Sequence, residues 1–276
     1  MIKYLQGLRC YDSDLITIVQ LRGLQEYTLL AHCFDFQYND DEVDLGKAIN
    51  CPSQIEDTII QRGGKVVKGL SANINVMQQS ISDNKFCIVE VDTFFIPWHP
   101  KFRKIHKNHY ILLGTFQSHG VLVYDTMCTK TFKLLAYEEF EKSMRSFDVW
   151  DFSNYVEQDI KIYPRKEQID DMLRWKERIQ GNDIFSSLHG LEIDSYEVPL
   201  YRHLWEIAYG RSLYGIYFAK ISQIGNEFNT SSVLWMQIRQ RAVWEYMQKS
   251  YNKENVLVAI DAAIDFDKNL LQKIYE

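Results

Sequence analysis

The chain has 276 residues, of which 46% are hydrophobic and 25% are charged, and its formal net charge is −6. This length suits one large domain or two smaller ones, and this composition predicts a substantial buried core. The acidic balance argues against a general nucleic-acid-binding protein. No apolar run approaches the roughly 20 residues that span a bilayer, so we expect no membrane partner either.

The cysteines are five in number, widely spread and without a C-x-x-C pair: Cys10, Cys33, Cys51, Cys87 and Cys128. An odd number in this pattern disfavours both a disulfide framework and a zinc ribbon. The first residues, MIKYLQGLRC, lack the long apolar stretch of a signal peptide. We therefore expect a cytoplasmic protein with free thiols.

Helices are expected at the start of the chain. Residues 11–33 carry apolar side chains at mostly three- to five-residue intervals, which predicts one long helix. Gly23 interrupts it, and suggests close packing against another backbone. A second helix is predicted around residues 53–62, ended by Gly63 and Gly64.

Strands are expected from residue 86 onward, where β-branched and aromatic residues dominate. Residues 109–116 and 120–127 predict an antiparallel hairpin, preceded by a buried strand in 86–95. A short amphipathic helix is expected over 136–144. No strand is predicted after about residue 160, and the rest of the chain reads as helices over 166–180, 198–226, 231–250 and 253–275.

The predicted fold class is therefore α+β, with an N-terminal helix and an antiparallel sheet followed by an all-helical C-terminal part. The expected domains are 1–160 and 161–276, with the boundary near IYPRKEQ (162–168). No Gly/Ser-rich or Pro-rich linker separates them, so we expect the two to pack together.

Three residues form a candidate catalytic triad. Cys10 stands at the start of the first helix, where the helix N-terminus and a nearby imidazolium stabilise a thiolate. His109 opens one strand of the hairpin and Asp125 lies near the end of the other, so the two fall nearly opposite each other. An acid there orients the imidazole. The alternatives are a buried cysteine, a strand-end histidine and a turn aspartate.

A family resemblance is carried by four segments: LRCYDSDL (8–15), VDTFFIPWHPKF (91–102), HKNHYILLGTF (106–116) and VLVYDTMCTKTFKLLAYEEFEKS (121–143). Together they resemble papain-like cysteine enzymes of the peptidase C39-like group, and most of all the family of the butirosin acyltransferase N-terminal domain. The polar residues that follow Cys10 depart from that family, which commonly has small residues and an aromatic-rich run there.

The resemblance implies a papain-like catalytic domain over 1–160 and an amide-forming acyltransferase of specialised-metabolite biosynthesis. Cys10 would be the nucleophile, His109 the base and Asp125 the orienting acid. The acyl donor would be a thioester on an acyl or peptidyl carrier protein, and the acceptor a small-molecule amine. No cofactor of the enzyme's own is implied. Gln6 would help to stabilise the oxyanion, although an exposed loop glutamine is the competing interpretation.

The segment PWHPKFRKIHKNH (97–109) is a dense basic stretch that leads into His109. Lys101, Arg103 and Lys104 are candidates to steer an acidic carrier protein and to hold its phosphate, as against ordinary surface charges. Trp98 and Asp92 complete the candidate substrate-binding set. Asp92 would pair with the amine acceptor, unless it is a hydrogen-bonded carboxylate at a strand end.

Other functions stay open. A zinc site built from His106, His109, His99 and His119 is disfavoured, because residues three apart on a strand face opposite sides. We therefore predict no metal. A thioesterase or cysteine peptidase would use the same triad, and a non-catalytic binding protein would keep the papain-like fold without turnover. The reactivity of Cys10 distinguishes a scaffold from an enzyme.

Overall fold

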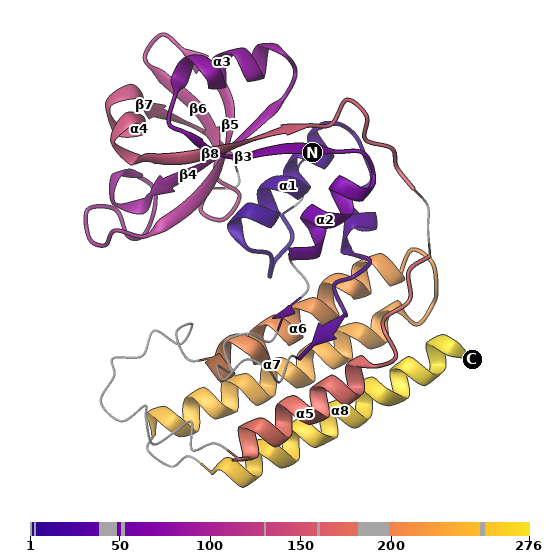
Figure 1. Ribbon diagram of the computed structural model, residues 1–276. Coiled ribbons are helices and arrows are strands. Elements are labelled where there is room, and N and C mark those ends of the chain that lie inside the picture. The colour runs from indigo at the N-terminus through magenta and orange to yellow at the C-terminus, as the bar shows by residue number, and fades with distance from the viewer. Residues whose placement is uncertain are drawn as a thin grey trace. The chain divides into compact units, whose positions relative to one another are not determined.

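The computed structural model describes residues 2, 4–38, 49–50, 53–129, 131–158, 161–181, 199–248 and 252–276 (Figure 1). The chain divides into two compact units. The first combines Met1–Leu29 with Ile55–Asp159, and the second combines Leu30–Gln54 with Ile160–Glu276. The fold class is α+β: a helix and an antiparallel sheet come first, and the C-terminal part is helical.

The first unit is built on a six-stranded sheet in which each strand is antiparallel to its neighbours, in the order β3-β8-β4-β5-β6-β7. The strands are β3 (Lys65–Ser71), β4 (Phe86–Asp92), β5 (Asn108–Gln117), β6 (Gly120–Tyr124), β7 (Phe132–Ala136) and β8 (Met144–Asp151). Its helical elements are α1 (Cys10–Leu21), η1 (Glu26–Leu30), α2 (Ser53–Gln61, whose first two residues fall in the second unit), α3 (Ile74–Ser82), η3 (Thr93–Phe95) and α4 (Tyr137–Ser143).

The core of this unit comes from alternate residues of the strands together with side chains of α3 and α4. It comprises Met77, Cys87, Val89, Val91, Ile96, Ile111, Leu113, Val121, Val123, Leu135, Phe140, Phe147 and Val149. The helix α1 contacts β4 and β5 and buries Leu15, Ile18 and Val19 completely. The sheet and α1 thus form one rigid framework for residues at the start of α1.

The strand predictions for the middle of the chain are confirmed, including the hairpin of β5 and β6. The expected helix around 53–62 is also present, and it ends before Gly63, whose φ of +92° is the left-handed conformation that glycine adopts without strain. The strand β8 was not predicted. It follows α4 directly at Met144, with no glycine or proline to separate a helical pattern from an alternating one.

The single long helix expected over 11–33 is wrong. The helix α1 ends at Leu21, and Gly23 follows it with a φ of +72°. The backbone of Leu24 then bonds to the carbonyl of Val19, which closes the helix in the manner of a C-terminal glycine cap. A Cβ at Gly23 would meet no atom within 4 Å, so this glycine is required by its backbone conformation and not by close packing.

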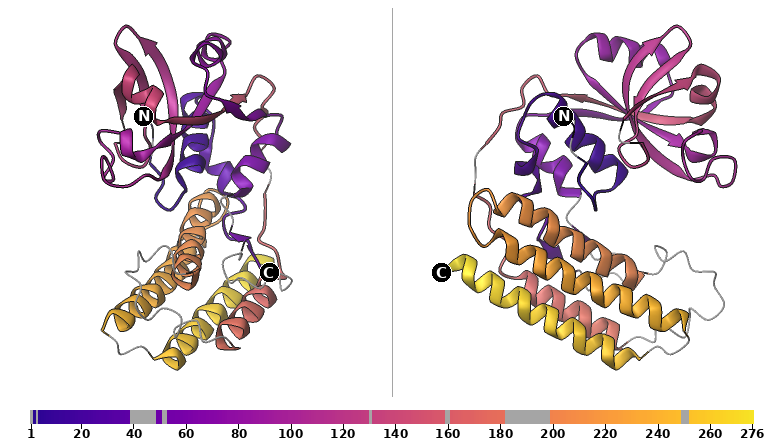
Figure 2. Two further views of the ribbon diagram at one scale, coloured as in Figure 1. Left: turned by 60° about the vertical axis from the view of Figure 1, so that its left-hand side comes forward. Right: turned by 180° about the vertical axis from the view of Figure 1, so that it is seen from behind.

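In the part of the second unit that the structure describes, four helices lie side by side in the order α6, α7, α8, α5 (Figure 2). They are α5 (Gln168–Gly181), α6 (Pro199–Phe218), α7 (Gly225–Met247) and α8 (Lys253–Tyr275), with a short antiparallel pair, β1 (Phe36–Gln37) and β2 (Ile49–Asn50). The predicted break between the middle helices lies six to eight residues too late in the sequence. The chain leaves α6 at Phe218 and re-enters a helix at Gly225, where a Cβ would lie 2.5 Å from the Cα of Ala219.

The segment Leu30–Gln54 belongs to the second unit, in contrast to the continuous domain expected over 1–160. Its aromatic side chains explain this placement. Phe34 packs against Tyr214 and Phe228, and Phe36 packs against Trp175. Burial of these aromatic rings among the helices stabilises the segment in the second unit, although the segment is close to α1 in the sequence.

A buried ion pair links the helices of this unit. The guanidinium of Arg211 donates two hydrogen bonds to Asp267 and one to the carbonyl of Phe34. Asp267 also accepts hydrogen bonds from Ser231 and Trp235. In the described part of the chain, no helix is both long enough and apolar enough to span a membrane.

Candidate active site

Cys10 is the first residue of α1 and its side chain is half-buried. The preceding Arg9 has the extended backbone of an N-cap residue but makes no side-chain capping bond. The first N–H groups of a helix have no partners within the helix and carry a partial positive charge, which favours an anion at this position. Cys10 therefore lies at a helix N-terminus, and its role as a nucleophile stays a prediction.

Tyr11 anchors this first turn of α1 to the sheet. Its hydroxyl donates to Asp148 of β8 at 2.6 Å and accepts from the indole of Trp150 at 3.1 Å. Its ring also lies edge-on against Tyr110 of β5. These contacts fix the start of α1 next to the residue that precedes Tyr110, which is His109.

His109 lies at the start of β5, opposite Val91 of β4, and its side chain is almost fully buried. Its Nε2 contacts Oδ1 of Asp125 at 3.1 Å, and the imidazole lies close enough to Cys10 for the two side chains to interact. Because Nε2 binds Asp125, Nδ1 is the nitrogen that remains available to the thiol. Burial lowers the pKa of His109, but the interactions with Asp125 and Cys10 outweigh burial and raise that pKa to about 10.

Asp125 immediately follows β6 and is completely buried. Oδ1 accepts hydrogen bonds from the backbone N–H groups of Met127 and Cys128, and Oδ2 accepts one from the indole of Trp98 at 2.9 Å. Burial raises the pKa of Asp125. The opposing effects of His109, the indole of Trp98 and the N–H of Cys128 are larger together, so the pKa lies below its ordinary value. An ionised Asp125 holds His109 with a proton on Nε2, as the third member of a triad does.

The structure thus brings together Cys10, His109 and Asp125 as the sequence predicted. It also shows that Trp98 binds Asp125, and the predicted part of Trp98 in substrate binding stays a prediction. The indole N–H of Trp98 binds Oδ2 of Asp125, and this oxygen is shielded from water. A tryptophan six residues after the strand-end Asp92 carries no sequence signal for this contact, because the partner is distant in the chain.

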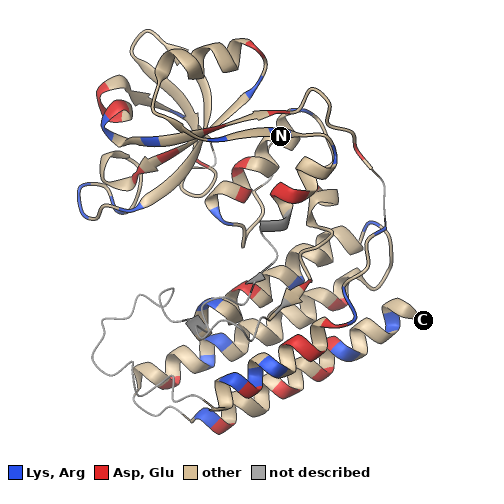
Figure 3. Ribbon diagram, viewed as in Figure 1, with Lys and Arg blue, Asp and Glu red and all other residues tan. Residues whose placement is uncertain are grey.

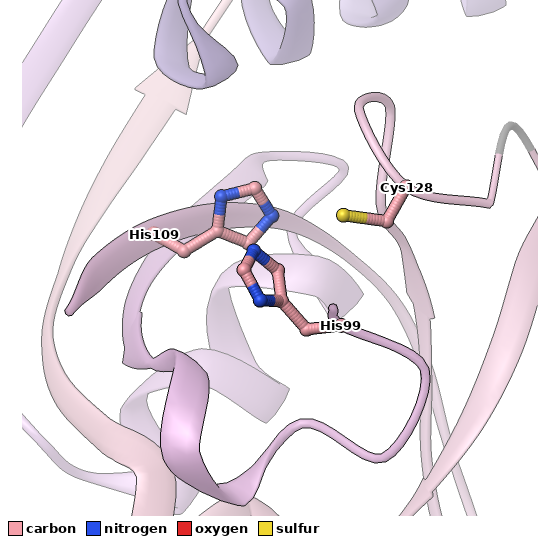
Figure 4. A group of neighbouring side chains, drawn as sticks. All are labelled: His99, His109 and Cys128. Atoms are coloured by element: carbon pink, nitrogen blue, oxygen red, sulfur yellow. The ribbon is translucent and has the colours of Figure 1, made fainter. Parts of the chain in front are cut away.

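His99 and Cys128 lie beside His109 (Figure 4). One ligand atom from each of the three residues lies within 4.8 Å of the others, the spacing of a candidate metal site among the described residues. However, Nδ1 of His99 accepts the N–H of Lys101, which places the ring proton on Nε2, and Nε2 of His109 is held by Asp125. Only His99 would have to change its hydrogen bonding before binding a metal, because His109 could offer Nδ1 while Asp125 still holds its Nε2–H. The set of three ligands is therefore not prepared for a resident ion at His99.

His106 and His119 stay apart from this cluster. His119 lies in the turn between β5 and β6. His106 binds the carboxylate of Asp92 at 2.8 Å and stacks on the ring of Phe94. Arg145 and the N–H of Phe94 also donate to Asp92. These contacts occupy the carboxylate within the protein and favour the strand-end interpretation of Asp92 over binding of an amine.

Gln6 lies in the turn just before α1, and its side chain is exposed. Its predicted role at the oxyanion stays a prediction.

Lys101 is half-buried, and Arg103 and Lys104 are exposed on the loop between η3 and β5, a segment rich in Lys and Arg (Figure 3). Arg103 lies over the ring of Phe102, and Lys104 donates to the carbonyl of Pro100.

Comparisons with known proteins do not assign a function to this chain, so the geometry of the site is the basis for assigning one. No family model matches the chain, and no curated protein matches it either. One similar solved structure is described as a C39-like peptidase from Bacillus anthracis, with 14% sequence identity and a TM-score of 0.37. The match covers 57% of this chain and 95% of that one. A likeness of this size carries no argument about chemistry.

Proposed function

We propose that this chain is a cysteine-dependent acyltransferase that carries its acyl group on Cys10. The observation that supports this most directly is the chain of contacts from Cys10 to His109 to Asp125, with the thiol at the start of a helix. A thiolate beside an imidazolium attacks activated acyl groups without a metal or ATP.

In the first half of the reaction, the Cys10 thiolate attacks the carbonyl carbon of a thioester. The tetrahedral intermediate collapses, the carbon–sulfur bond to the donor breaks, and the departing thiolate takes the proton from Nδ1 of His109. In the second half, an amine attacks the acyl-Cys10 carbonyl and gives its proton to His109. The Cys10–carbon bond then breaks, which releases the amide and restores the thiolate and the imidazolium.

We further propose that the donor is an acyl group on a carrier protein, bound through the basic loop. Lys101, Arg103 and Lys104 lie on the loop that leads from η3 to the strand of His109. Carrier proteins are acidic around a prosthetic arm that bears a phosphate, so positive charge on this loop favours their approach. The amine is a small molecule, and the enzyme needs no cofactor of its own.

Intact-protein mass spectrometry with a small acyl thioester tests the first proposal. We expect one acyl adduct, located on Cys10 by peptide mapping and lost in Cys10→Ala and His109→Ala. Cys128→Ala is the matched control, because Cys128 also lies beside His109 and its removal should leave the adduct on Cys10. Absence of any adduct from the wild-type protein would favour a non-catalytic binding protein.

The acceptor and the donor are tested separately. Amines added to the acyl-enzyme should yield amides; release of the free acid alone would instead indicate a thioesterase or peptidase with the same triad. Reversing the charge of Lys101, Arg103 and Lys104 to Glu should raise KM for an acyl-carrier donor and spare the small thioester. Equal losses on both donors would contradict carrier binding by this loop.

A further inference from the structure

Asp14 is a second carboxyl group at the candidate active site, and the proposed reaction does not use it. It lies four residues after Cys10 in α1, so both side chains lie on the same face of the helix. Its side chain is completely buried. Oδ1 accepts a hydrogen bond from the hydroxyl of Thr126 at 3.2 Å, whereas the buried Oδ2 has no hydrogen-bond partner among the described residues.

The groups that face Asp14 come from three elements. They are Cys10 on its own helix, His109 on β5, and Tyr124 and Asp125 at the end of β6. Burial raises the pKa of Asp14 well above its ordinary value, and the negative charges of Cys10 and Asp125 raise it further, against the opposing effect of His109. A buried carboxylate with one neutral donor and no cation bound to it is costly, so the neutral acid is the favoured form.

The contrast with Asp125 separates the two carboxyl groups. Asp125 receives hydrogen bonds from the imidazole of His109, the indole of Trp98 and two backbone N–H groups, which hold it ionised. Asp14 receives one bond, from a hydroxyl. Two neighbouring acids whose surroundings push their protonation in opposite directions take different roles.

We propose that Asp14 is a positioning residue that joins the helix of Cys10 to the loop of Asp125 as an uncharged carboxylic acid. This inference rests on the proposed function. Thr126 directly follows Asp125, so its bond to Asp14 closes a ring of contacts: from Cys10 to His109, to Asp125, to Thr126, to Asp14, and back along α1. The neutral form keeps this bond without placing a second negative charge beside the thiolate.

The test measures the pH dependence of iodoacetamide alkylation of Cys10, by peptide mass spectrometry, in four variants of the full chain. Asp14→Asn keeps an uncharged acceptor for Thr126, so its half-maximal pH should equal that of the wild type. Asp14→Ala and Thr126→Val remove the bond, so their half-maximal pH should move toward that of a free thiol, about 8.5. Acylation by a small thioester should fall roughly 10- to 100-fold in both, as for other small displacements of reacting groups.

Asp12→Asn is the matched control. Asp12 is also buried on α1, but the charged groups that affect it are Arg9 and Glu56, not His109 or Asp125. Its replacement should leave the alkylation profile of Cys10 in place. Thr126→Val retains Asp14 and loses only the hydroxyl, so it gives a readable result even if Asp14→Ala fails to fold.

Two results would overturn the inference. A lower half-maximal pH in Asp14→Asn would mean that Asp14 is charged, and an unchanged profile in Thr126→Val would mean that the bond does not position the thiol. A wild-type Cys10 that alkylates like a free thiol would overturn it as well. Failure of the proposed function would give a different result. Cys10 would then stay reactive toward iodoacetamide and show these shifts in half-maximal pH, but it would accept no acyl group from a thioester.

Discussion

Replacing Asp125 by asparagine removes the negative charge beside His109 and keeps the shape of the side chain. The amide oxygen can stay on the Oδ1 side, where it retains the bonds from His109 and from the N–H groups of Met127 and Cys128. The amide nitrogen then faces the indole N–H of Trp98, so one hydrogen bond is lost. Leaving that pair unsatisfied costs about 1–3 kcal/mol, which a folded variant can tolerate.

The expected effect is on the pKa of His109. In the wild type, the rise of this pKa from 6.5 to about 10 corresponds to about 5 kcal/mol in favour of the protonated ring, shared between Asp125 and Cys10 against the cost of burial. Loss of an adjacent opposite charge typically lowers such a pKa by about 1–3 units. Since the folded-state pKa is raised, the imidazolium persists up to about pH 10 in the wild type and is lost at lower pH in Asp125→Asn.

An NMR titration of ¹³C-labelled histidine side chains measures this directly, with the His109 signal assigned by His109→Ala. Asp92→Asn is the matched control, since it alters the other His–Asp pair at this end of the sheet and should not move the His109 midpoint. A midpoint near pH 10 in Asp125→Asn would refute the argument that Asp125 supplies the charge that holds the proton on His109.

Three further predictions concern stability and reactivity. Burial raises the pKa of Asp12 to about 7 from 3.8, so the folded state holds a proton that the unfolded chain releases. The free energy of unfolding should therefore fall by up to about 4 kcal/mol as the pH rises from about 4 to 7. In urea unfolding, Asp12→Asn should show a smaller fall over the same pH range. Asp267→Ala leaves the buried Arg211 without its counter-ion and should cost about 3–5 kcal/mol by the same assay. Burial raises the pKa of the Cys87 thiol to about 12, so it should alkylate only after denaturation.

Local sequence patterns predicted the elements that carry the triad. The hairpin follows from alternating apolar residues on either side of a short turn, and its antiparallel register brings His109 near Asp125 without further information. The end of α1 was not predicted, because the apolar periodicity continues past Gly23 and only the backbone conformation there stops the helix. The placement of Leu30–Gln54 depends on which aromatic partners Phe34 and Phe36 find, which is a property of the folded chain.

The two strand-end aspartates show most clearly where sequence reasoning reaches its limit. Asp92 is the last residue of β4 and Asp125 directly follows β6. Both precede a threonine, and both bind a histidine. These shared features do not separate the two pairs, although the hairpin pattern already places His109 near Asp125. The structure separates them by burial: the His106 side chain is 64% exposed and that of His109 only 8%.

That difference decides which pair can act on a thiol. The exposed imidazole of His106 is solvated by water, whereas the buried pair of His109 and Asp125 interacts in a medium of lower effective dielectric constant. Only His109 also reaches Cys10, because Tyr11 anchors the first turn of α1 to β8 beside Tyr110. Moving α1 away, by Tyr11→Phe for example, should weaken the nucleophile at Cys10 and leave both His–Asp pairs intact.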